Sequence, residues 1–379
     1  MTKSLRLVLY IHALAGGGAE RVWSVLASSL AKRGHEVILA VDYEAEENRT
    51  YLQPNVRLVV LGGSHAQTIG RLARLLATEK PDVALSALSA SNVKLTLAAL
   101  LAGCLGRTVL TYHGYAGSEP QRLSQLGFGL AALLTRLTAR TICVSDGLLR
   151  YLRDSCWASP SRSLRIYNPV LAEGAERPVD HTALRSRAPV VLAAGRFADY
   201  KNFAGLLRAF AAMNDAEARL VLIGDGPERR NLLVEVDRLG LRGRVEMPGY
   251  VTQPWRYFEQ AKCFVLPSRS ESFGLVLVEA MAHGLPVVAT DCDGPREILS
   301  HGTYGTLVPH DDPAALAAAI SRALEEPGDP ASRIARARHF DVDVAASQYE
   351  ALFRSVVAGA SKSPSLARLT AALFPPTPR

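Results

Sequence analysis

Residues 264–299 constrain the fold more than any other stretch of the chain, and they read FVLPSRSESFGLVLVEAMAHGLPVVATDCDGPREIL. The stretch divides into an apolar strand, a Ser-rich turn, a helix, a second apolar strand and a polar turn. A strand, a helix and a strand in this order form a βαβ unit. The sequence therefore predicts an α/β protein built on parallel strands.

The whole chain shows this alternation in two successive series. A first series runs from the strand 5–11 through helices that include one from Val93 and a long apolar one ending at Arg140, and a second series starts at Pro189. Short connections between alternating strands and helices indicate parallel sheets covered on both faces. The predicted divisions are a domain over 1–170, a linker over 171–188, a domain over 189–343, a closing helix over 344–360 that packs back towards the first domain, and a loose tail over 361–379.

Two carboxylates in the opening stretch, Glu271 and Glu279, are candidates for binding. The first lies in the turn and the second in the helix that follows Gly274. Helical rise places them at most about 12 Å apart, which suits the two ends of a nucleotide sugar. A carboxylate can accept two hydrogen bonds from a vicinal diol. The alternative interpretation is a surface Glu in a loop and a second Glu on an exposed helix face, although the apolar residues around Glu279 argue against exposure.

Other candidates follow strand ends. Arg196 and Lys201 stand in a strand-to-helix turn as a clamp for a diphosphate, or as two solvated cations. The turn AGGGAE offers glycines to an anion at a helix N-terminus, or needs them only for a tight turn. The third glycine of a dinucleotide fingerprint is replaced there by Arg21, so a nicotinamide cofactor is disfavoured. His113 follows a strand, where it binds ligand or serves the structure.

Composition sets further limits. The chain has 379 residues, 48% of them hydrophobic, and five scattered cysteines without metal-ligand spacing, which fits a reducing compartment without disulfides or structural zinc. A net charge of +7 without a basic aromatic stripe favours anionic ligands or membrane surfaces over nucleic acid. Two D-x-D matches, Asp291 to Asp293 and Asp341 to Asp343, are interpreted as helix caps rather than metal ligands. Ser145 and Asp146 are expected to cap the helix GLLRYLRD.

The motifs resemble those of glycosyltransferase family four, the retaining GT-B enzymes. GGGAER, IYNPV, GRFADYKN, GDGP, PSRSESFGLVLVEAMAHGLPVVAT and GPREI occur in the family's order and span nearly the whole chain. The resemblance implies two doubly wound Rossmann-like domains that face each other across a cleft, the first for an acceptor and the second for a nucleoside diphosphate sugar. Closure would bring Gly17 and His113 to the sugar.

The resemblance also implies roles for individual residues. Glu271 would hold the sugar hydroxyls, Glu279 the ribose, and Arg196 and Lys201 the diphosphate, with His113 beside the transferred sugar. The family's His is often followed by Asp, whereas Gly114 follows here. The implied catalytic residues are His113, Arg196, Lys201 and Glu271. The implied donor-binding residues are Gly17, Gly18, Gly195, Arg196, Lys201, Gly224, Tyr250, Val251, Glu271, Phe273, Gly274, Leu275 and Glu279.

The expected activity is retaining, metal-independent transfer of a hexosyl group, without a cofactor, from a UDP-sugar or GDP-sugar to a glycan or lipid-linked acceptor. It would serve cell-surface polysaccharide or glycolipid synthesis. The expected location is cytoplasmic, peripheral on the inner face of the cell membrane, with contact to anionic lipid that LARLTAALF in the tail would support. Two rivals stay open: a sugar-nucleotide epimerase, which needs no acceptor, and a non-catalytic nucleotide-sugar sensor.

Overall fold

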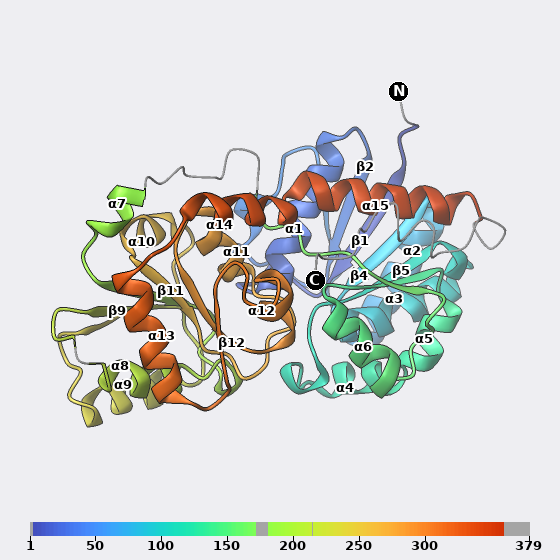
Figure 1. The fold of residues 1–379 in the computed structure, drawn as a ribbon. Helices are drawn as coiled ribbons and strands as arrows, with labels where there is room; N and C mark the ends of the chain where they lie inside the picture. The colour runs from blue at the N-terminus through green and yellow to red at the C-terminus, as the bar shows by residue number, and fades with distance from the viewer. Residues whose placement is uncertain (1–2, 172–180, 214, 360–379) are drawn as a thin grey trace. The chain divides into compact units, whose positions relative to one another are not determined.

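A computed structural model describes residues 3–171, 181–213 and 215–359. These residues fold as two compact units, the first formed by 3–169 with 342–359 and the second by 170–341 (Figure 1). The expected tail at 361–379 lies outside the described residues, as do residues 172–180 of the expected linker. The described part of the chain contains no helix that is both long and apolar enough to cross a bilayer.

The first unit is a seven-stranded parallel sheet in the order β3-β2-β1-β4-β5-β6-β7. Its strands are β1 (Arg6–Ile11), β2 (Glu36–Val41), β3 (Arg57–Val60), β4 (Val83–Ala87), β5 (Thr108–Tyr112), β6 (Arg140–Cys143) and β7 (Ser163–Arg165). Its helices are α1 (Gly18–Lys32), α2 (His65–Glu79), α3 (Ser89–Leu101), α4 (Arg122–Gly129), α5 (Ala131–Leu137), α6 (Asp146–Ser155) and α15 (Val342–Val357).

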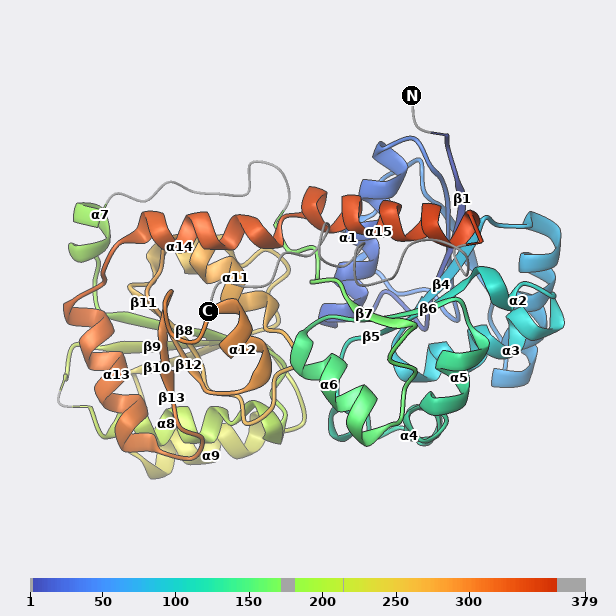
Figure 2. The ribbon, with the colours of Figure 1, turned by 45° about the vertical axis from the view of Figure 1, so that its right-hand side comes forward.

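Apolar residues of α2 and α3 pack on one face of this sheet. Helix α15 belongs to the first unit although it comes last in sequence, and it lies beside α1 (Figure 2). Arg33, which follows α1, donates through Nη2 to the Asp343 carboxylate at 2.8 Å and through Nη1 to Glu350 at 3.1 Å. These charged contacts fix the returning helix against the unit that began the chain.

The second unit is a six-stranded parallel sheet in the order β10-β9-β8-β11-β12-β13. Its strands are β8 (Val190–Ala194), β9 (Arg219–Ile223), β10 (Val245–Gly249), β11 (Cys263–Leu266), β12 (Val287–Thr290) and β13 (Thr306–Val308). Its helices are α7 (His181–Arg185), α8 (Phe203–Ala211), α9 (Arg229–Arg238), α10 (Trp255–Gln260), α11 (Leu275–Ala282), α12 (Asp293–Ile298), α13 (Pro313–Glu325) and α14 (Pro330–Ala337).

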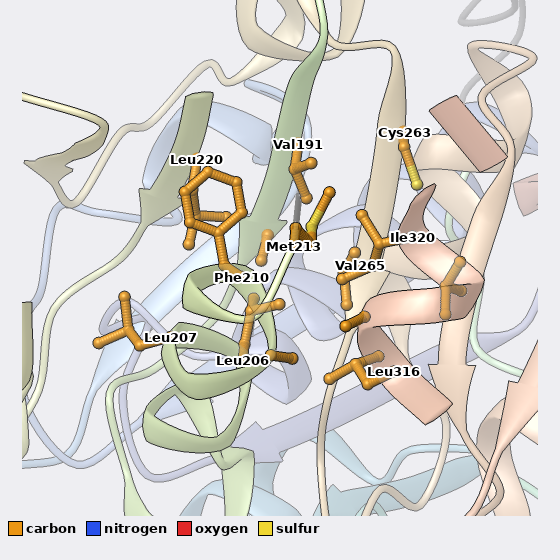
Figure 3. Close-up of a cluster of buried hydrophobic side chains, with 14 of the residues drawn as sticks. Val191, Leu206, Leu207, Phe210, Met213, Leu220, Cys263, Val265, Leu316 and Ile320 are labelled. Carbon is orange, nitrogen blue, oxygen red and sulfur yellow. The ribbon is translucent and has the colours of Figure 1, made fainter. Parts of the chain in front are cut away.

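One continuous apolar cluster fills the second unit between its sheet and the helices α8, α9 and α13 (Figure 3). Phe210 and Leu206 of α8 meet Val191 of β8, and Leu316 of α13 extends the cluster. The burial of these large side chains holds the strands in register, which in turn fixes where each strand ends.

Three local expectations were wrong. The apolar segment that was expected to form one helix to Arg140 forms α4 and α5, which meet at Leu130, and Arg140 itself begins β6. Helix α3 begins at Ser89, before Val93. Asp291 does not cap α12, because its carboxylate accepts from Nε of Arg296 at 2.7 Å and Cys292 is the N-cap.

The cap expected of Ser145 is confirmed, since its Oγ accepts from the backbone N–H of Leu148 at 3.1 Å. Asp146, expected to cap the same helix, is instead its first residue, and its Oδ1 accepts from Nε of Arg165 at 3.2 Å.

Candidate active site

Both sheets reverse their strand order at one point, between β1 and β4 in the first unit and between β8 and β11 in the second. In an open parallel sheet the loops that leave the carboxyl ends of two such strands run to opposite faces, which opens a crevice where ligands bind. The loop after β8 carries Arg196 and Lys201, and the loop after β11 carries Glu271. Three predicted residues of the second unit therefore flank its switch point.

Lys201 and Glu271 form a direct ion pair from Nζ to Oε2. The two side chains are 16% and 12% exposed. Burial favours the neutral amine, but the adjacent Glu271 carboxylate outweighs burial, and the pKa of Lys201 is raised. Sequence reasoning assigned Lys201 to a diphosphate and Glu271 to sugar hydroxyls, and the structure places the two side chains in contact. Oε1 of Glu271 has no hydrogen-bond partner among the described residues.

Arg196 is exposed one residue after Gly195, on a backbone that is held tightly. The N–H of Phe197 donates to the carbonyl of Asp225 at 2.9 Å, which ties this turn to the turn after β9. Gly224 has a φ of 137°, and a Cβ there would lie 1.9 Å from the carbonyl oxygen of Gly195. Only glycine permits this approach, so the motifs GRF and GDGP form one rigid support for the Arg196 side chain.

Helix α11 follows Gly274, whose φ of 108° is in the left-handed region. Phe273 is buried against Phe340, with ring centroids 5.6 Å apart, and Leu275 begins the helix. Glu279 is 2% exposed, so the interpretation as an exposed helix residue is wrong. Its carboxylate lies inside the second unit, one turn along α11 from the helix start.

Tyr250 and Val251 follow β10, which is the edge strand of the second sheet. Tyr250 is half-exposed and directly follows Gly249. The carbonyl of Gly249 accepts from the N–H of Gly224 at 2.9 Å, so Tyr250 lies next to the turn after β9. These two residues share the carboxyl edge with the ion pair, but two strands, β9 and β8, separate β10 from β11.

In the first unit the predicted residues lie at the carboxyl edge of that unit's own sheet. Gly17 is the N-cap of α1 and Gly18 its first residue. The carboxylate of Glu20 folds back onto this turn, because a Cβ at Gly17 would lie 2.0 Å from its Oε2. The helix N-terminus that was expected to meet an anion thus already has a carboxylate beside it. An arriving phosphate would be repelled there, whereas a hydroxyl would find an acceptor.

His113 follows β5, one strand beyond the switch point. Its Nε2 lies 3.0 Å from Oγ1 of Thr111, and the Trp23 ring meets it edge to face with centroids 5.5 Å apart. Burial lowers the pKa of His113 to about 4, so the imidazole is neutral at physiological pH. A neutral imidazole can donate or accept one hydrogen bond without introducing charge.

The described residues contain no group of three or more His, Cys, Asp or Glu side chains arranged to hold a metal ion. Of the two D-x-D matches, Asp291 pairs with Arg296 and Asp343 pairs with Arg33.

Two known families match successive parts of the chain. The family Glycosyltransferase Family 4 matches residues 16–173, and the family Glycosyl transferases group 1 matches residues 177–340. The chain belongs to the GT-B glycosyltransferases.

Relatives of this glycosyltransferase act in several settings. The lipopolysaccharide core biosynthesis glycosyltransferase LpsD of Rhizobium meliloti is 28% identical over 84% of this chain and 88% of its own length. The N-acetyl-alpha-D-glucosaminyl L-malate synthase of Bacillus anthracis is 25% identical over 90% of this chain and 94% of its own. The solved structure of Anabaena HepE with UDP and glucose has a TM-score of 0.79 at 21% identity, and covers 93% of this chain and 100% of its own.

Sequence reasoning missed Glu119 of this glycosyltransferase. Its Oε2 accepts from the backbone N–H of Ser89 at 3.1 Å, at the start of α3, and its Oε1 has no hydrogen-bond partner in the described structure. Burial, with a smaller contribution from the Glu20 carboxylate, raises the pKa of Glu119 to about 7. Leu88, which precedes Ser89, has a φ of 74°, and this left-handed conformation is strained for a branched side chain.

A second missed group lies after β2. Lys94 of α3 pairs through Nζ with Oδ2 of Asp42, and these side chains are 3% and 9% exposed. Oδ1 of Asp42 accepts from the Tyr10 hydroxyl at 2.6 Å, and Nδ1 of His12 lies 3.4 Å from Oδ2. Lys94 is one charge within an apolar helical pattern, and nothing in that pattern indicates which carboxylate it meets.

Proposed function

We propose that this glycosyltransferase moves a hexosyl group, with retained configuration, from a nucleoside diphosphate sugar to a glycan or lipid-linked acceptor. The observation that carries the proposal is the ion pair of Lys201 and Glu271 beside the second switch point. A buried cation at this edge favours an anionic ligand, and a carboxylate with one open oxygen favours a hydroxyl. A sugar attached to a diphosphate offers both groups within one molecule.

In the proposed reaction, the bond between the anomeric carbon and the diphosphate oxygen breaks as the acceptor oxygen bonds to that carbon from the same face. The leaving diphosphate takes the acceptor proton. Lys201 and Arg196 stabilise the charge that develops on the diphosphate, and Glu271 holds the sugar through its open oxygen. Fixed cations then do the neutralising, so the proposal requires neither a metal ion nor a cofactor.

Glu279 is proposed to bind the ribose, with Gly274 and the start of α11 close to the donor. His113 and the turn at Gly17 are proposed to meet the acceptor and the transferred sugar, since this edge carries carboxylates and a neutral imidazole. Those groups suit hydroxyls better than phosphates.

The relatives support the choice of donor and setting. HepE is a neighbour in fold whose structure holds UDP, which favours UDP over GDP here, and LpsD acts in lipopolysaccharide core synthesis. We therefore propose that the chain works in cell-surface polysaccharide or glycolipid synthesis, in the cytoplasm and in peripheral contact with the inner face of the cell membrane.

The test begins with thermal unfolding in UDP-, GDP- and ADP-sugars. A donor at one hundred times its dissociation constant should add about 2.7 kcal/mol to stability. The stabilising donor is then incubated with acceptor glycans, with and without a chelator, and NMR of the product reads the anomeric configuration. Inverted product would reject retention. An altered free sugar without acceptor would indicate an epimerase, and binding without transfer or hydrolysis would indicate a sensor.

A further inference from the structure

The solvent side of α4 and α5 has an unusual composition. Its exposed positions include Leu126, Leu133 and Leu137, together with Arg122 and Arg136. The outer face of a surface helix normally mixes charges of both signs, whereas this one combines leucine with arginine. The apolar side chains here point away from the core, so the fold of the first unit does not explain them.

Trp157, after α6, belongs to the same surface and is the most exposed large apolar residue of the described chain, at 73%. Its φ is 57°, and the N–H of Ala158 donates to the carbonyl of Leu152 at 3.0 Å, which closes the C-terminal turn of α6. Glycine is favoured at such a left-handed position. The Trp157 backbone is therefore strained, although its bulky ring packs little against its own unit.

Hydrogen bonds connect this turn to α5. Nη1 of Arg136 donates to the carbonyl of Trp157 at 2.9 Å, and the N–H of Ser159 donates to Oγ1 of Thr135 at the same distance. The exposed ring is thus fixed beside the helix that carries Leu133 and Leu137.

Helix α3 packs against α4 and α5 (Figure 2), and it has exposed leucines of its own. Its exposed residues Leu97, Leu100 and Leu101 recur at helical spacing on one side of the helix. We call the exposed residues of α3, α4 and α5 together with Trp157 the apolar-basic face. It comprises Leu97, Leu100, Leu101, Arg122, Leu126, Leu133, Arg136, Leu137 and Trp157.

On α3, α4 and α5 the exposed charges have one sign, whereas α6, which precedes Trp157, carries the exposed Asp154 as well as the exposed Arg150. Residues 83–145 contain a single carboxylate, Glu119, which is buried, and they contain the arginines 107, 122, 136 and 140. A symmetric contact with a second copy of the chain would bring the same arginines of both copies together, which is unfavourable. An anionic lipid surface instead complements the arginines, while tryptophan and leucine favour the interface between headgroups and acyl chains.

We propose that the apolar-basic face docks the protein onto an anionic lipid bilayer. The docking needs no donor or acceptor, although it deepens the proposed function, because it would hold the first unit where lipid-linked acceptors lie. Binding to vesicles is therefore measurable whether or not transfer occurs.

The experiment is sedimentation of the full chain with vesicles of phosphatidylcholine alone or mixed with phosphatidylglycerol. The wild type should pellet with the mixed vesicles, less so at high salt, because screening weakens attraction to the lipid surface. Trp157→Gly combined with Leu133→Ser should weaken binding at least ten-fold. Arg122→Gln should weaken it about five-fold, as one basic residue near an anionic surface contributes about that factor.

The variants are chosen to remain folded. Glycine suits the backbone at position 157, so Trp157→Gly should keep or raise thermal stability. The matched control replaces the exposed Leu233 and Val234 of α9, in the second unit, by serine and should leave binding unchanged.

Three results would overturn the proposal: no binding to the mixed vesicles, equal binding by the double variant, or a dimer in light scattering that Trp157→Gly dissociates. Loss of vesicle binding with intact transfer to a water-soluble acceptor supports the assignment of the face. Failure of transfer in the wild type, with vesicle binding intact, would reject only the proposed function.

Discussion

Each unit buries a lysine against a carboxylate at the carboxyl edge of its sheet, but the two pairs differ in what else their carboxylates contact. In the first unit both oxygens of Asp42 are occupied, by Lys94 and His12 on one and by the Tyr10 hydroxyl on the other. In the second unit Glu271 meets Lys201 through one oxygen and keeps the other open. The carboxylate of the first pair therefore has no oxygen left for a ligand, whereas that of the second pair has one for the proposed sugar contact.

The largest expected effect tests the open pair. Glu271→Ala removes both the partner of Lys201 and the proposed sugar contact, so transfer should fall about 1,000-fold or more, as measured by product formation at saturating donor. It also leaves a buried amine without its counter-charge, which should destabilise the protein.

The double variant Glu271→Ala with Lys201→Met is the control, because it removes the uncompensated charge. It should regain thermal stability without regaining transfer. Recovery of transfer in the double variant would show that Glu271 acts only on folding, and the contrast between the pairs would fail.

The next effect tests the closed pair. Lys94→Met leaves the buried Asp42 without its cation, so the free energy of unfolding in urea should fall by about 3 kcal/mol, with kcat within a few-fold of the wild type. Arg6→Met breaks the exposed pair with Glu36 and should leave the free energy of unfolding nearly unchanged, because water screens this pair. A Lys94→Met protein of normal stability that lacks transfer would contradict this comparison, because the pair of Lys94 and Asp42 would then serve transfer and not stability.

We call the carboxyl edges of the first and second sheets the first edge and the second edge. Much of the second edge could be predicted, because local sequence encodes where strands end. The apolar runs at 190–194 and 263–266 gave the two strands, and the turn residues after them gave Arg196, Lys201 and Glu271. The ion pair could not be predicted, since it joins residues 70 positions apart and depends on the order of the strands. The order of the strands in the sheet cannot be deduced from the pattern of apolar and polar residues along the chain.

The first edge was harder to predict for physical reasons. Glu119 matters because it is buried beside Ser89, and burial is a property of the packed unit. Glu20 was passed over as part of a glycine motif, yet it changes the electrostatics of the α1 N-terminus. The end of α4 and the start of α5 at Leu130 could not be predicted, because apolar residues continue on both sides of this position.

A third prediction concerns the exposed cation of the second edge. Arg196→Ala should lower kcat about 100-fold, because one donor aimed at developing charge is lost, and it should leave the melting temperature unchanged. Arg208→Ala, on α8 of the same unit, removes an exposed arginine away from the switch point and should keep kcat near the wild-type value. If both variants are equally active, the second edge does not hold the diphosphate through Arg196.

The smallest effect separates two titrating groups of the first edge. Burial lowers the pKa of His113 from 6.5 to about 4, so between these values the unfolded chain binds a proton that the folded chain does not, and stability rises with pH. Burial raises the pKa of Glu119 from 4.5 to about 7, so there the folded chain binds the extra proton, and stability falls with pH. The two contributions oppose each other and nearly cancel between pH 5 and 7.

Glu119→Gln removes one contribution and exposes the other. The free energy of unfolding of this variant should rise by about 2 kcal/mol from pH 5 to 7, whereas that of the wild type should stay nearly flat over the same range, as measured by urea unfolding. His113→Gln should show the opposite slope, a fall of about 2 kcal/mol. Parallel pH profiles for all three proteins would mean that neither group is shifted. The first edge would then hold a charged carboxylate at neutral pH, and its contrast with the cationic second edge would become sharper.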